Sequence, residues 1–106
     1  MAAQDSVGST LVLNSTAAAN STVISADRGE GDLLWFGCPV LASTSDTVTL
    51  EYSVDDEVTW YPCRDSSGTA YSWTAPFVGI LQGPYPVVRF VKTGANGACE
   101  IYVRAG

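Results

Sequence analysis

The chain has 106 residues, enough for one domain, and its 25 Val, Thr and Ile residues against 12 Glu, Lys, Gln, Arg and Met residues favour strands over helices. It has no histidine, which excludes a Ser-His-Asp triad, a Cys-His pair and a histidine-ligated zinc site. With a net charge of −6 and no apolar run of about 18 residues, we expect neither nucleic acid nor a membrane as partner.

The N-terminal residues are small and polar. We expect 1–9 to form a flexible arm ahead of a single domain at 10–106. This segment has no basic region followed by an apolar one, so we expect no signal peptide and synthesis in the cytoplasm. The Asn-x-Ser/Thr sequons at Asn14 and Asn20 are then ordinary polar turn residues.

The first strands are expected to be short. Residues 11–13 and 22–25 predict strands, and the stretch 14–20 between them is compatible with a single helical turn. A polar loop with two glycines follows at 27–32. The continuous apolar run at 33–36 predicts a strand that is buried on both faces.

The clearest strand covers 47–54, after a loop at 42–46. Its side chains alternate at period two, which points one set to the core and the other to water. The set expected in the core is Val48, Leu50, Tyr52 and Val54. The set expected in water is Thr47, Thr49, Glu51 and Ser53.

Three further strands are expected before the last glycine-rich connection. They cover 58–61 after a tight acidic turn, 70–73 after the turn at 65–68, and 77–82. The Gly-Pro-Tyr-Pro segment at 83–86 excludes a central strand, because neither proline can donate to a ladder.

Residues 87–93 and 98–104 flank Gly94-Ala-Asn-Gly97, and this short connection predicts a β-hairpin. Eight or nine short strands without a long helix are typical of an all-β, antiparallel β-sandwich of the jelly-roll or Ig-like type. The residues predicted to face inward are Val48, Leu50, Tyr52, Val54, Trp60, Val88, Phe90, Ile101 and Val103.

The spacing of Cys38, Cys63 and Cys99 matches no metal-binding pattern. An odd number of cysteines without a signal peptide predicts free, buried thiols, with Cys99 pointing inward. The alternative is one bridge, either Cys38–Cys63 or Cys63–Cys99.

Charged residues are interpreted as solvated. Arg89, Lys92 and Arg104 lie in the last 18 residues, where we favour solvated strand faces over a local basic strip. The acidic run 55–57 also suggests calcium, but consecutive side chains in a turn point apart. We predict no metal and no cofactor.

One motif stands out in the sequence. Ser53-Val-Asp-Asp-Glu-Val-Thr-Trp60 resembles the Asp-box, Ser-x-Asp-x-Gly-x-Thr-Trp. The matching Ser53, Asp55, Thr59 and Trp60 are predicted to stabilise a hairpin: the Asp accepts backbone N–H groups and the Trp packs its ring over the turn. Glu57 replaces the glycine, whose backbone tends toward positive φ, so we expect a longer or different loop. Asp-boxes occur in sialidases, but a single hairpin predicts no sugar cleavage.

Aromatic residues are plentiful, with three Trp and five Tyr. Tyr71 and Trp73 share a strand face, and with Tyr85 they are candidate interface residues. An aromatic platform for sugar is the alternative. We expect no enzyme, because no connecting loop is long enough to hold paired carboxylates across a cleft.

Residues 47–104 resemble small β-sandwich virion proteins of tailed bacteriophages, of the capsid decoration (cement) type. The resemblance lies in the Thr/Val-rich strand and Asp-box-like turn at 47–62, the Thr-Ala-Pro bend at 74–76, the Gly-Pro-Tyr-Pro segment and the Val-Arg-Phe-Val strand. It implies a non-catalytic protein on the outer capsid surface that binds the major capsid protein as a homo-oligomer, typically a trimer.

Two alternatives to this function remain open. One is a carbohydrate- or receptor-binding β-sandwich module, and the other is a tail or neck subunit of a phage.

Overall fold

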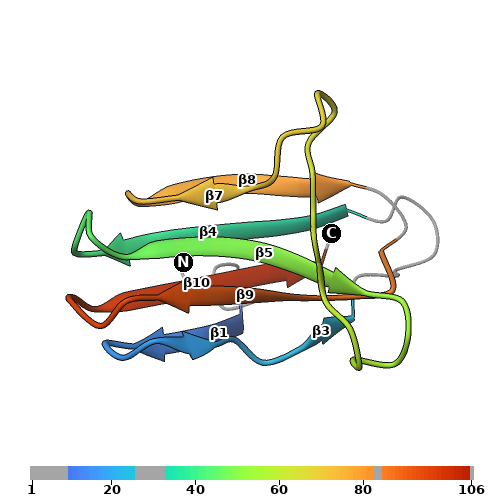
Figure 1. Cartoon of the computed structure of the whole chain (residues 1–106). Coiled ribbons are helices and arrows are strands. Elements are labelled where there is room, and N and C mark those ends of the chain that lie inside the picture. Colours follow the sequence, from blue (N-terminus) through green and yellow to red (C-terminus); the bar gives the residue numbers. More distant parts are fainter. Residues whose placement is uncertain (1–9, 26–32, 83–84, 106) are drawn as a thin grey trace.

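The computed structural model describes residues 10–25, 33–82 and 85–105, and these residues form an all-β sandwich (Figure 1). The strands are β1 (Thr10–Ser15), β2 (Ala19–Asn20), β3 (Ile24–Ser25), β4 (Leu33–Leu41), β5 (Thr47–Ser53), β6 (Tyr61–Pro62), β7 (Ser72–Trp73), β8 (Phe77–Gln82), β9 (Val87–Thr93) and β10 (Cys99–Ala105). The expected fold class is confirmed. Within the described ranges no helix is present that could cross a membrane. The arm expected at 1–9 and the loop expected at 27–32 lie outside the described residues.

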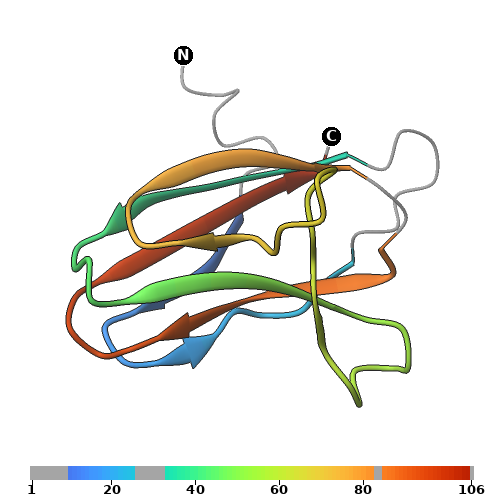
Figure 2. The same cartoon turned by 45° about the horizontal axis from the view of Figure 1, so that its top comes forward.

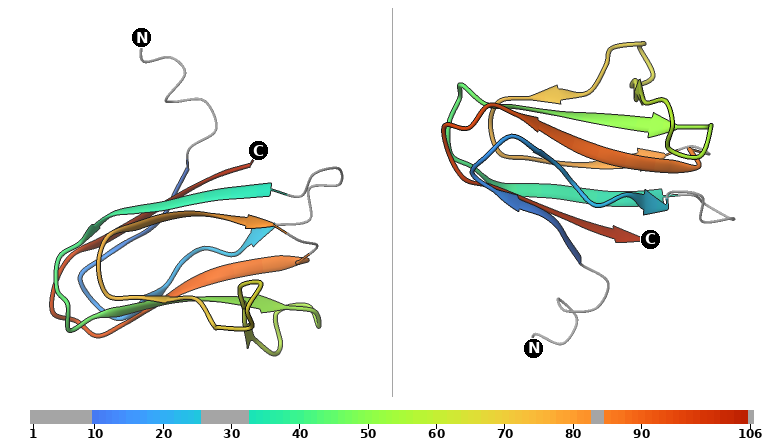
Figure 3. Two further views of the ribbon diagram at one scale, coloured as in Figure 1. Left: turned by 90° about the horizontal axis from the view of Figure 1, so that it is seen from above. Right: turned by 60° about the horizontal axis from the view of Figure 1, so that its bottom comes forward.

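The strands form two antiparallel sheets that lie face to face, and Figure 3 shows them as two layers. Sheet A has the order β1-β10-β4-β8. Sheet B has the order β2-β9-β5-β6, and in addition β3 pairs with β9 and β7 pairs with β5. The long strands β5 and β9 hold sheet B together, paired along their whole length from Thr47↔Thr93 to Ser53↔Val87.

Sheet A contains two irregularities of register, one where β1 pairs with β10 and one where β10 pairs with β4. In β1 an extra residue turns both Val12 and Leu13 into the core, because a bulge interrupts the alternation of faces. The bulge also bends β1, which is one of the two edge strands of sheet A.

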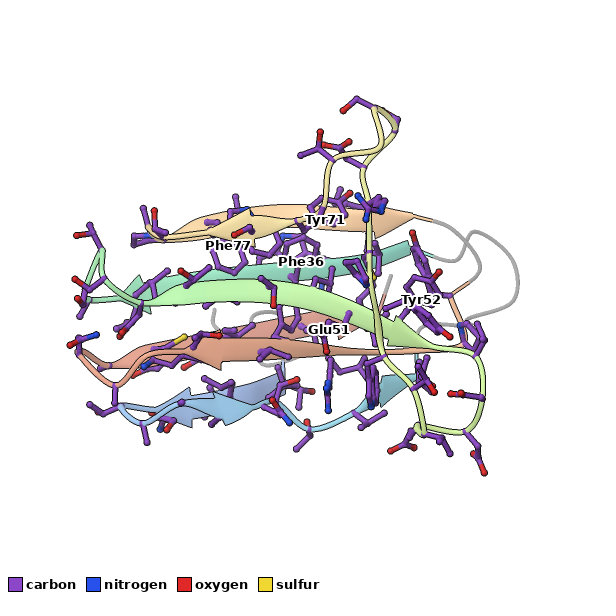
Figure 4. The ribbon with its side chains drawn as sticks, in the orientation of Figure 1. Phe36, Glu51, Tyr52, Tyr71 and Phe77 are labelled. Carbon is purple, nitrogen blue, oxygen red and sulfur yellow. The ribbon has the colours of Figure 1, made fainter. Side chains whose placement is uncertain are left out.

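Phe36 of β4 lies at the centre of the core between the two sheets. Its ring centroid is 5.5 Å from that of Phe90 in sheet B and 6.0 Å from that of Phe77; Phe77 and Tyr71 are labelled beside it in Figure 4. Gly79 makes room for this ring, since a Cβ there would lie 2.7 Å from Phe36 Cζ. The buried apolar residues are Val12, Leu13, Ile24, Leu34, Phe36, Cys38, Leu41, Val48, Leu50, Cys63, Leu81, Val88, Phe90, Cys99, Ile101 and Val103.

Much of the predicted core is confirmed. The confirmed residues are Val48, Leu50, Val88, Phe90, Ile101 and Val103. Tyr52 packs against this core but is only partly buried. The strands predicted at 77–82 and 87–93 have the same bounds in the structure.

The hairpin predicted from 87–93 and 98–104 is wrong. β9 pairs in sheet B and β10 pairs in sheet A, so residues 94–97 form an arch that crosses from one layer to the other, seen at one end of the sandwich in Figure 2. The arch is stable without hairpin bonds because Asp46 accepts the backbone N–H groups of Asn96 and Gly97. Gly94 allows the sharp turn with a φ of 102°.

The helical turn considered for 14–20 is also wrong. Asn14 and Ser15 continue β1, and Ala19 and Asn20 form β2. Pairing with β10 and β9 outweighs the weak local preference of so short a segment.

The strand predicted at 33–36 is longer than expected and is not buried on both faces. It continues to Leu41, and Trp35 is only partly buried while Leu34 and Phe36 point inward. The apolar run therefore reflects a strand with one core face and one apolar outer face.

The alternation predicted for 47–54 fails at its last two positions. Val54 is 64% exposed and Ser53 is buried, because β5 ends at Ser53 and the chain then turns. The strand predicted at 58–61 shrinks to Tyr61–Pro62, and Val58 is 79% exposed.

Candidate functional site

The outer face of sheet A carries an apolar row that crosses all four strands. Leu11 of β1 pairs with Tyr102 of β10, Tyr102 with Gly37 of β4, and Gly37 with Val78 of β8. Residues paired across strands point to the same face, and Leu11 and Val78 are 43% and 66% exposed. The row therefore presents apolar side chains to solvent on both sides of Tyr102.

A second row runs beside the first. Arg104 of β10 pairs with Trp35 of β4, and Trp35 pairs with Ile80 of β8, which is 57% exposed. The Arg104 guanidinium carbon lies 5.6 Å from the centroid of the Trp35 ring, within the range of a cation–π contact. We call the surface formed by both rows the sheet A patch; its apolar members are Leu11, Trp35, Gly37, Val78, Ile80 and Tyr102.

A shallow hollow of about 290 Å³ lies within the sheet A patch. Gly37 lies under the ring of Trp35, since a Cβ at this position would come to 3.0 Å from Trp35 Cη2. Trp35, Pro39, Val78 and Tyr102 are among the residues that line the hollow. Such a lining suits an apolar or aromatic group of a partner.

Tyr102 is held in place by a neighbour on its own strand. Its hydroxyl donates a hydrogen bond to Glu100 Oε1 at 3.2 Å, and this bond raises the pKa of Tyr102. The hydroxyl is therefore held beside Glu100 within the apolar row.

The Asp-box-like turn has the hydrogen bonds that the motif predicts. Ser53 Oγ donates to Asp55 Oδ1 at 2.8 Å, and the backbone N–H of Thr59 donates to the same oxygen at 2.8 Å. These bonds, the one from the Thr59 N–H first, lower the pKa of Asp55. Glu57 has a φ of 70°, so the positive φ is kept despite the missing glycine. The expectation of a longer or different loop stays a prediction. Ser53, Asp55 and Thr59 thus act together to close the turn.

The predicted place of Trp60 in the core is wrong, and its predicted packing over the turn stays a prediction. Trp60 is partly buried on the outer face of sheet B, where the Arg89 guanidinium carbon lies 4.2 Å from its ring centroid. Arg89 Nη2 also pairs with Glu51 Oε1 at 2.9 Å. The Arg89 guanidinium stacked on the Trp60 indole therefore lies on the outer face of sheet B.

The three candidate interface residues lie at two places. Tyr71 and Trp73 stack with ring centroids 5.6 Å apart, and Trp73 stacks on Phe77 at 3.9 Å. Tyr85 packs on Tyr52, with centroids 4.8 Å apart. All three are partly buried against the core, and their role in an interface stays a prediction.

All three cysteines are free and buried, as predicted. Burial raises the pKa of Cys38 and of Cys63 to about 12. Neither considered bridge forms; instead the Sγ atoms of Cys38 and Cys99 lie 3.9 Å apart. Cys99 points inward as expected.

The basic residues near the C-terminus lie in three different places, two on opposite outer faces and one in the core. Arg89 lies on the outer face of sheet B and Arg104 is exposed on sheet A, so no basic strip forms. Lys92 is only 1% exposed, so the expectation that it is solvated is wrong. Lys92 alternates with the inward-facing Val88 and Phe90, which would have predicted its inward direction. The sequence prediction did not follow this pattern, because lysines are rarely buried in a core.

The sheet A patch is the feature that sequence reasoning missed. Its members come from four strands, and their proximity depends on pairings that no single segment encodes. A weak signal exists in β8, where Val78 and Ile80 alternate with the inward-facing Leu81 and leave both faces apolar.

In the described part of the chain, no three His, Cys, Asp or Glu side chains gather as a metal site. Comparisons with protein families, curated proteins and solved structures found no match to this chain.

Proposed function

We propose that the chain is a non-catalytic structural protein of a tailed-phage virion, which binds the outer capsid through the sheet A patch and stabilises the shell. The observation that carries the proposal is the apolar row from Leu11 to Val78, which crosses all four strands of one sheet and is exposed to solvent at both of its ends. Contiguous exposed apolar surface of this kind marks contact sites between proteins.

The two outer faces of the sandwich differ in a way that favours sheet A. Sheet B shows the Arg89–Glu51 ion pair and polar threonines. Sheet A also carries charged residues, Arg104 and Glu100, but it exposes the apolar Leu11, Val78 and Ile80 beside them. The resemblance over residues 47–104 supplies the class of partner, the major capsid protein. In this function the aromatic and aliphatic side chains contribute affinity by burial, and many copies on one shell add their weak contacts.

The proposal is tested on virions of the phage that encodes the chain. We expect mass spectrometry of purified particles to find the chain in hundreds of copies, and electron microscopy to place it on the outer capsid. Its absence from purified particles would refute the proposal, and a position on the tail or neck would move the same docking surface to another part of the virion.

A matched pair of variants ties the binding to the sheet A patch. Tyr102→Asp places a charge at the centre of the row, and we expect binding to particles stripped of the chain to weaken by at least about 30-fold, or ~2 kcal/mol. Val54→Asp adds the same charge at an exposed turn position and should bind normally. Equal loss with both variants would contradict the assignment of the face.

The hollow beside Trp35 and Tyr102 favours one second candidate, a carbohydrate- or receptor-binding module. A sugar stacked on Trp35 would quench tryptophan fluorescence. A glycan that quenches the wild-type protein but not Trp35→Leu, together with no binding to capsids, would establish that candidate instead.

A further inference from the structure

Three of the four sheet edges in the sandwich are protected against strand addition. β1 carries a bulge. The flanks of sheet B are formed by two-residue strands, β2 and β3 on one side and β6 and β7 on the other, and β6 includes Pro62. Bulges, very short strands and prolines are the devices that prevent uncontrolled pairing at edges.

β8 is the fourth edge, and it has none of these devices. Its six residues pair with β4 without a shift, from Leu33↔Gln82 to Cys38↔Phe77, and they include no proline and no charged residue. Among the described residues no strand pairs with its other side, which forms the upper rim of the sandwich in Figure 1. The backbone N–H and C=O groups on that side are available to a further strand.

Charge also singles out this edge. Residues 66–88, which include β7 and β8, contain no acidic or basic side chain, although the chain as a whole has a net charge of −6. Two acidic copies repel each other over most of their surfaces. β8 carries no charge of its own, and Arg64 and Asp65, which line a hollow with Ile80, have opposite charges, so two copies approach at this edge at least electrostatic cost.

The order of side chains along β8 is nearly symmetric about Gly79. Val78 and Ile80 flank it on the outer face and are 66% and 57% exposed, while Phe77 and Leu81 flank them toward the core. Antiparallel pairing of two β8 strands about a two-fold axis at Gly79 would set Val78 of one copy opposite Ile80 of the other. Cross-strand pairs of β-branched residues stabilise a sheet.

We propose that β8 is an assembly edge, at which a second copy of this chain adds its own β8 to form a symmetric dimer with one continuous eight-stranded sheet. The two sheet A patches then join into a single surface, because Val78 and Ile80 belong to both the patch and the edge. The inference replaces the trimer expected from the sequence, and it holds whether or not the partner of the patch is a capsid.

A hairpin closed by the bridge between Arg64 and Ala70 rises beside one end of this edge. A hollow of about 500 Å³ is lined by the hairpin residues Arg64, Asp65, Ser66 and Tyr71 and by Ile80. Ile80 is 57% exposed and is therefore accessible from outside the sandwich. Figure 1 shows the hairpin above one end of β8.

Sedimentation equilibrium tests the proposal on the purified chain. We expect a species of twice the 11.1 kDa chain mass, and Ile80→Lys should raise its dissociation constant at least about 10-fold. Val78→Lys is a second variant with the same expectation, and thermal unfolding confirms that both remain folded. Val58→Lys, which adds the same charge at a 79% exposed position on the Asp-box-like turn, should dimerise like the wild type. A monomer at about 1 mM, a trimer, or a dimer insensitive to both edge variants would overturn the proposal.

Cross-linking tests the register. A mixture of Val78→Cys and Ile80→Cys proteins should form a disulfide-linked heterodimer under mild oxidation by oxidised glutathione, which is reduced as the bond forms. Each variant alone should cross-link at least about 10-fold more slowly, because its two cysteines lie diagonally across the pairing. Faster cross-linking of either single variant would show that the strands pair in another register.

Discussion

Lys92 and Asp46 form an ion pair inside the sandwich, with Lys92 Nζ 3.1 Å from Asp46 Oδ2 and both side chains fully buried. Lys92 Nζ also donates to the carbonyl oxygens of Thr16, at 2.9 Å, and of Gly94. Asp46 accepts three N–H groups from Asn96 and Gly97, so both charges are fully hydrogen-bonded. The pair therefore links three connections at one end of the fold, those between β1 and β2, between β4 and β5, and between β9 and β10.

Removing one partner of this pair is predicted to be severely destabilising. Lys92→Met leaves the Asp46 carboxylate buried without its counter-ion, and we expect a loss of roughly 3–5 kcal/mol in the free energy of unfolding, measured with urea. Arg89→Met removes the partly exposed pair with Glu51 and should cost about 1 kcal/mol or less. Similar losses for both variants would show that the buried pair has no special role.

Acid is predicted to unfold the protein through its hydrogen-bonded aspartates. Burial acts against ionisation of Asp46, but the hydrogen bonds from Asn96 and Lys92 lower its pKa. Hydrogen bonds from Ser67 and Thr69 lower the pKa of Asp65. The hydrogen bond from Thr59 lowers the pKa of Asp55. The pKa values of these aspartates are lower in the folded than in the unfolded chain. Their contribution to the free energy of unfolding is therefore complete above about pH 5 and is lost as pH falls through about 4 and below.

Thermal unfolding from pH 7 to pH 2 checks this expectation. The midpoint should be nearly constant down to about pH 5 and then fall. Asp55→Asn and Asp65→Asn should each lower the midpoint at neutral pH and make the acid decline shallower. A midpoint that rises on acidification would contradict the assignment.

The core prediction is tested at the paired strands β5 and β9 of sheet B. Leu50 and Phe90 are fully buried and pair across β5 and β9, so Leu50→Ala and Phe90→Ala should each cost roughly 2–5 kcal/mol. Val54→Ala, at an exposed position, should change the free energy of unfolding by less than about 0.5 kcal/mol. A loss below about 1 kcal/mol for both Leu50→Ala and Phe90→Ala would show that the strands are in the other register, because a one-residue slip exchanges the two faces.

The thiols are predicted to be unreactive in the folded protein. Cys38, Cys63 and Cys99 are fully buried, and burial raises the pKa of each. A disulfide reagent at pH 8 should label none of them in the native state and all three after unfolding. Rapid labelling of native Cys99 would contradict its inward orientation.

The Asp-box-like turn offers a stabilising substitution. Glu57 has a φ of 70°, which costs energy for a residue with a Cβ, so Glu57→Gly should raise the free energy of unfolding by about 0.5–1 kcal/mol. Asp56→Gly, at a φ of 66°, should gain less, because Asp tolerates this conformation better. A destabilised Glu57→Gly would show that the side chain has a role in the turn that outweighs its strain.

The sequence predicts strands well where alternation is regular and predicts pairings poorly. The inward direction of Val88 and Phe90 follows from period two, whereas the strand at 77–82 follows from an apolar run between two turn segments. The connection at 94–97 has the same local signature for a hairpin and for an arch. The choice is made by Asp46, about fifty residues earlier in the chain, which no local pattern can supply.

The candidate site was less predictable than the fold. The closing residues of the Asp-box-like turn follow from the motif, because Ser53, Asp55 and Thr59 interact within one short segment. The sheet A patch depends on the register of four strands from both ends of the chain, and Leu11 meets Tyr102 across some ninety residues of sequence.

The arch at 94–97 has a consequence for biosynthesis. It delivers β9 and β10, the last two strands of the described sandwich, to positions with a neighbour on either side, β9 in sheet B and β10 in sheet A. The earlier strands β1, β4 and β5 therefore wait on the ribosome without their principal partners until residues 87–105 emerge. A domain with such distant pairings folds at the slow rates of β-proteins, and the unguarded β8 is exposed to other nascent chains until its sheet is complete.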